Sequence, residues 1–147
     1  MKIGEPAPDF TLESQTGEKV RLADYFGRKK IILFFYVKDN TPGCTSEAIG
    51  IKNLYSKISD KYEVIGINHD SKESHGRFCQ KYDLPFKILS DPGKKIASLY
   101  GAKGILGMYT RRITYLIGLD GKIEKIVDGI GASPHVEFVE KLNPEPN

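Results

Sequence analysis

Apolar residues along this 147-residue chain follow two kinds of spacing, one typical of strands and one typical of helices. Residues 31–37 form an unbroken apolar run, which is typical of a central strand covered by helices on both faces. Apolar side chains then recur at helical spacing, which predicts a helix over about residues 44–60. Residues 63–68 indicate a second buried strand. This part of the chain therefore predicts strands that alternate with helices.

Shorter patterns predict the remaining elements. Residues 10–12 and 19–21 flank a turn at Gly17, which predicts a hairpin near the N-terminus. Asp70, with Glu73 three residues later, resembles a capping box and predicts a helix that ends near residue 82. The other expected elements are a strand at 86–90, a short helix from Asp91-Pro92 to Gly101, a hairpin of 112–118 and 122–127 around Asp120-Gly121, and a helix from Ser133-Pro134 to about Leu142.

The order of these elements predicts the fold. After the N-terminal hairpin the order is β-α-β-α-β-β-α with residues 86–101 inserted, which is the order of the thioredoxin fold. We expect an α/β protein with a mixed central sheet sandwiched by helices, an N-terminal β-hairpin extension and an inserted strand-helix. Residues 1–147 are expected to form a single domain. The glycine-containing loop 101–110 is expected to be mobile, and the tail 143–147 disordered.

Charge and hydropathy argue against several classes of protein. The chain has 22 Lys and Arg against 19 Asp and Glu, a net charge of +3, and the signs alternate, so nucleic-acid binding is not indicated. The longest apolar run is far shorter than the roughly 20 residues that cross a bilayer, so no membrane association is expected. The first ten residues lack the apolar core of a signal peptide, and we therefore expect a cytoplasmic protein.

Two cysteines, Cys44 and Cys79, are too few for a structural disulfide framework in a reducing compartment. Cys44 falls in the first turn of a predicted helix, where free backbone N–H groups and the helix dipole favour a thiolate. Thr41 supplies a hydroxyl three residues earlier, and Pro42 and Gly43 shape the turn. The alternative is that Cys44 is a small buried apolar residue and Thr41 is only the N-cap of the helix.

The residues around Cys44 resemble a known sequence motif. The stretch Tyr36-Val-Lys-Asp-Asn-Thr-Pro-Gly-Cys-Thr-Ser-Glu47 resembles the active-site signature of peroxiredoxins, specifically the bacterioferritin comigratory protein (peroxiredoxin Q) subfamily. Further matches are found at residues 4–10, 82–86 with 90–92, and 112–117 with 120–121, so the resemblance covers nearly the whole chain. It implies that Cys44 is the peroxidatic cysteine and that Thr41 and Arg112 are active-site residues. By the same resemblance Glu47 orients Arg112.

The resemblance implies a thiol-dependent peroxidase that reduces hydrogen peroxide and organic hydroperoxides through a sulfenic acid at Cys44, with no cofactor and no metal. Arg112 would stabilise the thiolate and the charge that grows on the leaving oxygen. Val37, Pro42 and Gly43 would line the substrate pocket, although the family usually has proline where this chain has Val37. Subfamily resemblance also indicates a monomer or a weak homodimer.

Cys79 matches one of two family patterns for a second cysteine. Many members carry it five residues after the first, where this chain has Ile49. Other members place the resolving cysteine on the helix after the second strand, where Cys79 is predicted. The resemblance therefore implies that Cys79 attacks the sulfenic acid, and that a thioredoxin-like dithiol reduces the resulting disulfide. The alternative is that Cys79 is an inert buried thiol and that an external thiol does this work.

Two rival functions remain open on the sequence. Cys44, His69, His75 and Cys79 could form a zinc-binding module, although the first two lack the tight paired spacing of structural zinc sites, and His75 is expected to be a solvated helix residue. A thiol–disulfide oxidoreductase is the other rival, but that chemistry usually needs a Cys-x-x-Cys pair. The two cysteines here are 35 positions apart.

Overall fold

The computed structural model describes residues 1–104 and 107–142. Within these residues one sheet of seven strands runs in the order β2-β1-β5-β4-β3-β6-β7. The strands are β1 (Thr11–Ser14), β2 (Lys19–Arg21), β3 (Lys30–Phe35), β4 (Tyr62–Asn68), β5 (Lys87–Ser90), β6 (Ile113–Ile117) and β7 (Ile123–Asp128).

Four α-helices occur in the same described residues: α1 (Pro42–Ile58), α2 (Lys72–Tyr82), α3 (Lys95–Tyr100) and α4 (Ser133–Lys141). Short 3-10 turns, Leu22–Tyr25 and Pro92–Lys94, precede β3 and α3. No helix in 1–104 or 107–142 combines the length and the apolar character needed to cross a membrane.

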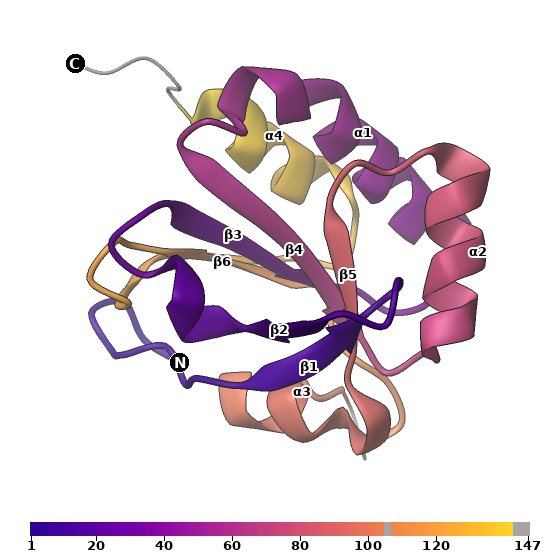
Figure 1. The fold of residues 1–147 in the computed structure, drawn as a ribbon, viewed down its shortest axis with the longest axis horizontal. Helices are drawn as coiled ribbons and strands as arrows, with labels where there is room; N and C mark the ends of the chain where they lie inside the picture. Colours follow the sequence, from indigo (N-terminus) through magenta and orange to yellow (C-terminus); the bar gives the residue numbers. More distant parts are fainter. Residues whose placement is uncertain (105–106, 143–147) are drawn as a thin grey trace.

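The sheet is mixed, as the pattern predicts. Strands β3, β4 and β5 pair in parallel, while β6 pairs antiparallel with β3 and β7 antiparallel with β6. The N-terminal hairpin joins the sheet through the antiparallel pairing of β1 with β5. The predicted hairpin extension and the inserted strand-helix, which is β5 followed by α3, are therefore both confirmed (Figure 1).

Helices cover both faces of the sheet. Figure 1 shows α1 and α4 next to each other on one side and α3 on the opposite side, and two separate apolar cores fill the spaces between. Ile32 and Phe34 of β3 belong to the core beneath α1, α2 and α4, whereas Ile31, Leu33 and Phe35 belong to the core that includes residues of α3 and the hairpin. Burial on both faces explains why the strand is apolar at every position.

The start of α2 differs from the predicted capping box. The N-cap is Ser71, whose hydroxyl oxygen accepts a hydrogen bond from the Ser74 backbone N–H at 3.1 Å. The Asp70 carboxylate instead accepts from the backbone N–H of Asp39, at 2.8 Å. Asp70 therefore fastens the loop before α1 to the end of β4. The predicted mobility of loop 101–110 falls partly on residues 105–106, and that of the tail on 143–147, all of which lie outside the described residues.

Candidate active site

Cys44 lies in the first turn of α1, directly after the loop that leaves β3. Thr41 is the N-cap in an extended conformation, and Pro42 begins the helix, where its fixed φ suits the first position. The Cys44 side chain is 2% exposed. The sulfur is thus held at a helix N-terminus and is almost entirely shielded from solvent.

Arg112 contacts the sulfur directly. Its Nη2 donates to Cys44 Sγ at 3.2 Å, its Nη1 donates to the Glu47 carboxylate, and its Nε donates to the Ile130 carbonyl at 2.7 Å. The residue immediately precedes β6, which pairs with β3, and this pairing brings Arg112 to the end of β3 from which the Cys44 loop departs. Although burial opposes its charge, Glu47 and Cys44 raise the pKa of Arg112. The guanidinium is therefore a fixed cation beside the sulfur.

Glu47 lies one helical turn after Cys44 and is fully buried. Burial raises the pKa of its carboxyl from 4.5 to about 7, against the opposing effect of Arg112. Its Oε1 accepts from Arg112, and its Oε2 has no hydrogen-bond partner among the described residues. The structure therefore brings together the three residues Cys44, Glu47 and Arg112 that the sequence singles out.

Thr41 and Gly43 lie just before Cys44, at the N-cap and in the first turn of α1. The Thr41 hydroxyl does not cap the helix, because it donates to the Lys38 carbonyl at 2.8 Å. Its oxygen can still accept a hydrogen bond from another group. A Cβ added at Gly43 would lie 3.2 Å from Arg112 Nη2, so the glycine gives the guanidinium room. Pro42 is exposed at the helix start.

A small cavity of about 170 Å³ opens beside Arg112. Its lining residues are Val37, Tyr109, Arg111, Arg112, Asp128, Gly129 and Ile130. Its volume lies below the usual range of sites for drug-sized ligands, and it suits a ligand of a few atoms. Val37 therefore lines a cavity next to Arg112, whereas Cys44, Pro42 and Gly43 are not among its lining residues.

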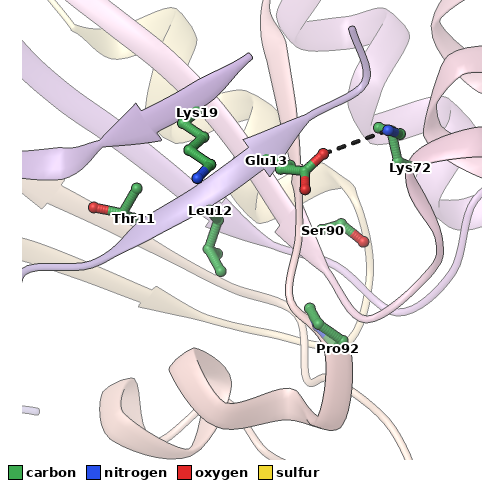
Figure 2. A pocket seen from close by; sticks show the side chains of 7 residues that line it. All are labelled: Thr11, Leu12, Glu13, Lys19, Lys72, Ser90 and Pro92. Carbon is green, nitrogen blue, oxygen red and sulfur yellow. Dashed lines mark hydrogen bonds and ion pairs between the residues drawn. The ribbon is translucent and has the colours of Figure 1, made fainter. Parts of the chain in front are cut away.

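A larger cavity, of about 440 Å³, lies elsewhere, over strands β1 and β5 (Figure 2). Its lining residues are Thr11, Leu12, Glu13, Lys19, Lys72, Ser90 and Pro92. Lys72 Nζ and Glu13 Oε2 form an ion pair across it at 3.4 Å. None of the site residues expected from the sequence lines this cavity.

Cys79 lies on α2, where the sequence predicts it, and belongs to the same apolar core as Cys44. Both thiols are free. Burial, with a smaller effect from the charge of Asp39, raises the pKa of the Cys79 thiol to about 12. In this conformation Cys79 is therefore a protonated thiol.

His75 differs from the prediction of a solvated residue, because its side chain is fully buried. Its Nδ1 lies 2.7 Å from Asp39 Oδ2, and the same carboxylate accepts hydrogen bonds from Tyr36 and Ser74. This network requires a buried carboxylate five residues before Cys44, which helical spacing within α2 does not reveal. His69 is half-buried, with Nδ1 3.1 Å from Thr110 Oγ1. Within residues 1–104 and 107–142, no three His, Cys, Asp or Glu side chains gather in a metal-holding arrangement.

Sequence reasoning missed His135 of α4. The side chain is fully buried, and its Nδ1 lies 3.8 Å from Glu47 Oε2. The sequence signal is weak, since His135 only falls in the first turn of the last helix. Contact between α4 and α1 brings it to the site.

Comparisons with known proteins identify relatives of this chain. Residues 3–126 match the AhpC/TSA family. Peroxiredoxin Bcp of Bacillus subtilis is 37% identical over 145 residues, covering 92% of this chain and 90% of that protein. Chloroplastic peroxiredoxin Q of Sedum lineare is 38% identical over 142 residues, covering 95% of this chain and 76% of that protein.

A solved structure extends the likeness to three dimensions. The crystal structure of peroxidoxin BcpB from Mycobacterium tuberculosis superposes with a TM-score of 0.87 at 29% identity, covering 95% of this chain and 94% of that one. The expected thioredoxin-like fold agrees with this likeness. With the family match and the two relatives, it shows that the chain belongs to the AhpC/TSA family, among relatives of the Bcp and Q types of peroxiredoxin.

Proposed function

We propose that this protein is a thiol-dependent peroxidase in which Cys44 is the nucleophile. The observation that carries the proposal is the hydrogen bond from Arg112 Nη2 to Cys44 Sγ, 3.2 Å long, in the first turn of α1. A guanidinium and a helix N-terminus both stabilise a thiolate, which is the reactive form of cysteine. The small cavity beside Arg112 leaves space for a peroxide.

The reaction proceeds by attack of the Cys44 thiolate on one peroxide oxygen. The S–O bond forms as the O–O bond breaks, and the sulfur becomes a sulfenic acid while the leaving oxygen departs with the electron pair and takes a proton to give water or an alcohol. Arg112 stabilises the negative charge as it moves from sulfur to the leaving oxygen. The Thr41 hydroxyl oxygen, whose own proton is donated to Lys38, accepts the peroxide O–H and orients it.

Cys79 then resolves the sulfenic acid. The Cys79 thiol gives up its proton and the resulting thiolate attacks Cys44 Sγ, so that the disulfide forms and the sulfenic hydroxide leaves with a proton as water. A thioredoxin or similar dithiol then reduces the disulfide. Support comes from the position of Cys79 in the same apolar core as Cys44. Its burial and raised pKa require α2 to open locally before the attack. A one-cysteine cycle with an external thiol is the second candidate, which is favoured by the burial of both free thiols.

Peroxide consumption in the presence of excess dithiothreitol tests the proposal. We expect wild-type protein and Cys79→Ser to consume hydrogen peroxide and an alkyl hydroperoxide, because dithiothreitol can reduce a sulfenic acid or a disulfide. We expect Cys44→Ser to lose this activity. The two variants are matched, since each replaces one buried cysteine by serine. Activity that persists in Cys44→Ser would overturn the proposal.

A further inference from the structure

The second carboxylate oxygen of Glu47 is the starting observation. Its side chain is fully buried, its Oε1 accepts from Arg112, and its Oε2 makes no hydrogen bond within the described residues. His135 Nδ1 lies 3.8 Å from that oxygen. A buried charged oxygen without a partner is costly, so the protonation of this pair of side chains requires an explanation.

The contacts of His135 fix where its ring carries hydrogen. Its Nε2 lies 2.9 Å from the Gly129 carbonyl, which can only accept, so Nε2 bears a hydrogen. Its Nδ1 lies 2.7 Å from the Thr114 hydroxyl. Burial, with Arg112 acting in the same direction, lowers the pKa of His135 and favours the neutral ring. The neutral ring therefore has a lone pair at Nδ1, which accepts from the Thr114 hydroxyl and lies 3.8 Å from Glu47 Oε2.

The buried charges at this site balance only if one further proton is present. Cys44, Glu47 and Arg112 are all buried, and a thiolate plus a carboxylate would leave one negative charge beyond what Arg112 neutralises. We propose that Glu47 and His135 together hold one proton, on the carboxyl or on the ring, so that Cys44 is the sole anion paired with Arg112. The proposal rests on the proposed function for the role of Cys44. His135 then acts as a positioning residue through Glu47.

Other groups face this pair from each neighbouring element. Cys44 lies on α1 with Glu47, Arg112 precedes β6, Thr114 lies on β6, and Asp128 ends β7. Asp128 is itself paired with Arg111 at 2.7 Å on the exposed side. When rising pH removes this proton, the Glu47 carboxylate competes with Cys44 for Arg112. The reaction with peroxide therefore slows above the pH at which the pair loses its proton.

His135→Gln is the decisive variant. The glutamine amide can still donate to the Gly129 carbonyl, but it offers no basic nitrogen to Glu47. The measurement is the second-order rate constant of Cys44 with hydrogen peroxide, by stopped flow, from mildly acid to alkaline pH. In the plot of this rate constant against pH, we call the fall at high pH the alkaline limb. We expect the alkaline limb to move to lower pH by about one unit, which corresponds to a roughly tenfold weaker affinity of the pair for the proton. A merely structural role would leave the limb in place.

Thr114→Val supplies an opposite expectation in a variant of similar shape. It removes the hydroxyl that donates to His135 Nδ1, so the lone pair becomes free for the shared proton. The alkaline limb should then move to higher pH. A shift in the same direction as His135→Gln would contradict the proposal, since both substitutions would then act only by disturbing the packing.

A readout independent of activity separates this proposal from the proposed function. In protein with ¹³C-labelled glutamate carboxyls, the signal absent from Glu47→Gln reports the protonation of Glu47. We expect its midpoint to fall in His135→Gln, and His135→Gln to add no further pH shift to the Glu47→Gln background. An unchanged midpoint, or a shift that persists in that background, overturns the proposal. Failure of wild-type protein to react with peroxide refutes the proposed function, while the carboxyl titration still decides about the shared proton.

Discussion

Arg112 Nη2 donates to Cys44 Sγ at 3.2 Å, and the same guanidinium holds Glu47 through Nη1. One planar cation therefore serves two buried groups of α1 that lie a single turn apart. Its Nε is tied to Ile130, so the fork cannot rotate away from the sulfur without losing a third hydrogen bond. The orientation of this cation is built into the fold, before any substrate arrives.

Replacement of Arg112 by lysine should lower kcat/KM for peroxide about 10²- to 10³-fold. Lysine keeps the charge but offers one ammonium in place of a rigid fork, so it cannot hold Glu47 and reach Cys44 together. Steady-state peroxide consumption with dithiothreitol measures the effect. A loss below fivefold would show that charge alone suffices and that the fork has no role.

Arg21→Lys is the matched control for that substitution. Arg21 pairs with Asp9 at 2.8 Å on the exposed surface and does not contact the Cys44 site. Exposed ion pairs contribute little to stability, so kcat/KM and the unfolding free energy should both stay close to wild type. A comparable loss of activity in this variant would mean that the assay responds to any arginine substitution.

Glu47 should make the protein less stable as pH rises. The folded state holds the Glu47 proton up to about pH 7, whereas the unfolded chain releases it near 4.5, so the unfolding free energy falls between these values. The loss amounts to about 3 kcal/mol in total. Urea unfolding at several pH values should show this slope in wild type and a flatter profile in Glu47→Gln. Equal slopes in both proteins would contradict the raised pKa.

Gly50 is expected to be essential to the contact between α1 and α4. A Cβ there would lie 2.7 and 2.9 Å from the two methyl groups of Val136. Gly50→Ala should therefore lower the unfolding free energy by about 1–2 kcal/mol, since overpacking outweighs the gain in helix propensity. Urea unfolding measures it, and adding Val136→Ala should recover part of the loss.

Gly76→Ala provides the comparison within α2. A Cβ at Gly76 would meet only the Gln15 carbonyl, at 3.7 Å, which is an ordinary contact. The helix-propensity gain should then dominate and raise the unfolding free energy by up to about 1 kcal/mol. If both alanine variants change stability in the same direction, the account of Gly50 as a packing residue is wrong.

Disulfide formation should depend on local opening of α2. After one equivalent of peroxide, sub-denaturing urea should speed the appearance of the Cys44–Cys79 disulfide roughly twofold to fivefold, because opening exposes buried surface. Mass spectrometry of quenched samples follows the loss of two hydrogens. The rate of sulfenic acid formation at Cys44 should not change. A stable sulfenic acid that never forms the disulfide would instead favour the one-cysteine cycle.

The strands and helices follow closely from the apolar pattern, because burial on one or both faces of each element determines it. Boundaries follow less well, since they depend on individual hydrogen bonds. The helix predicted from Asp70 begins after Ser71, because the Asp70 carboxylate is engaged by the Asp39 backbone, a contact between segments 31 positions apart. Such a contact leaves no mark in local spacing.

The site residues also differ in how well the sequence predicts them. The sequence motifs point to Cys44, Glu47 and Arg112, and the structure brings their side chains together. His135 could not, because its place beside Glu47 depends on how α4 packs on α1. The burial of His75 likewise depends on Asp39, in a different segment. Tertiary contacts between distant segments determine the position of His135 and the burial of His75.

The central claim is that the sulfur of Cys44 is the atom that peroxide oxidises. The direct measurement uses Cys79→Ser, treated in its reduced form with one equivalent of hydrogen peroxide and a sulfenic-acid trapping reagent, followed by peptide mass spectrometry. The account predicts one stoichiometric adduct, on the peptide that contains Cys44. Peroxide consumed at the wild-type rate with no adduct on that peptide would contradict it.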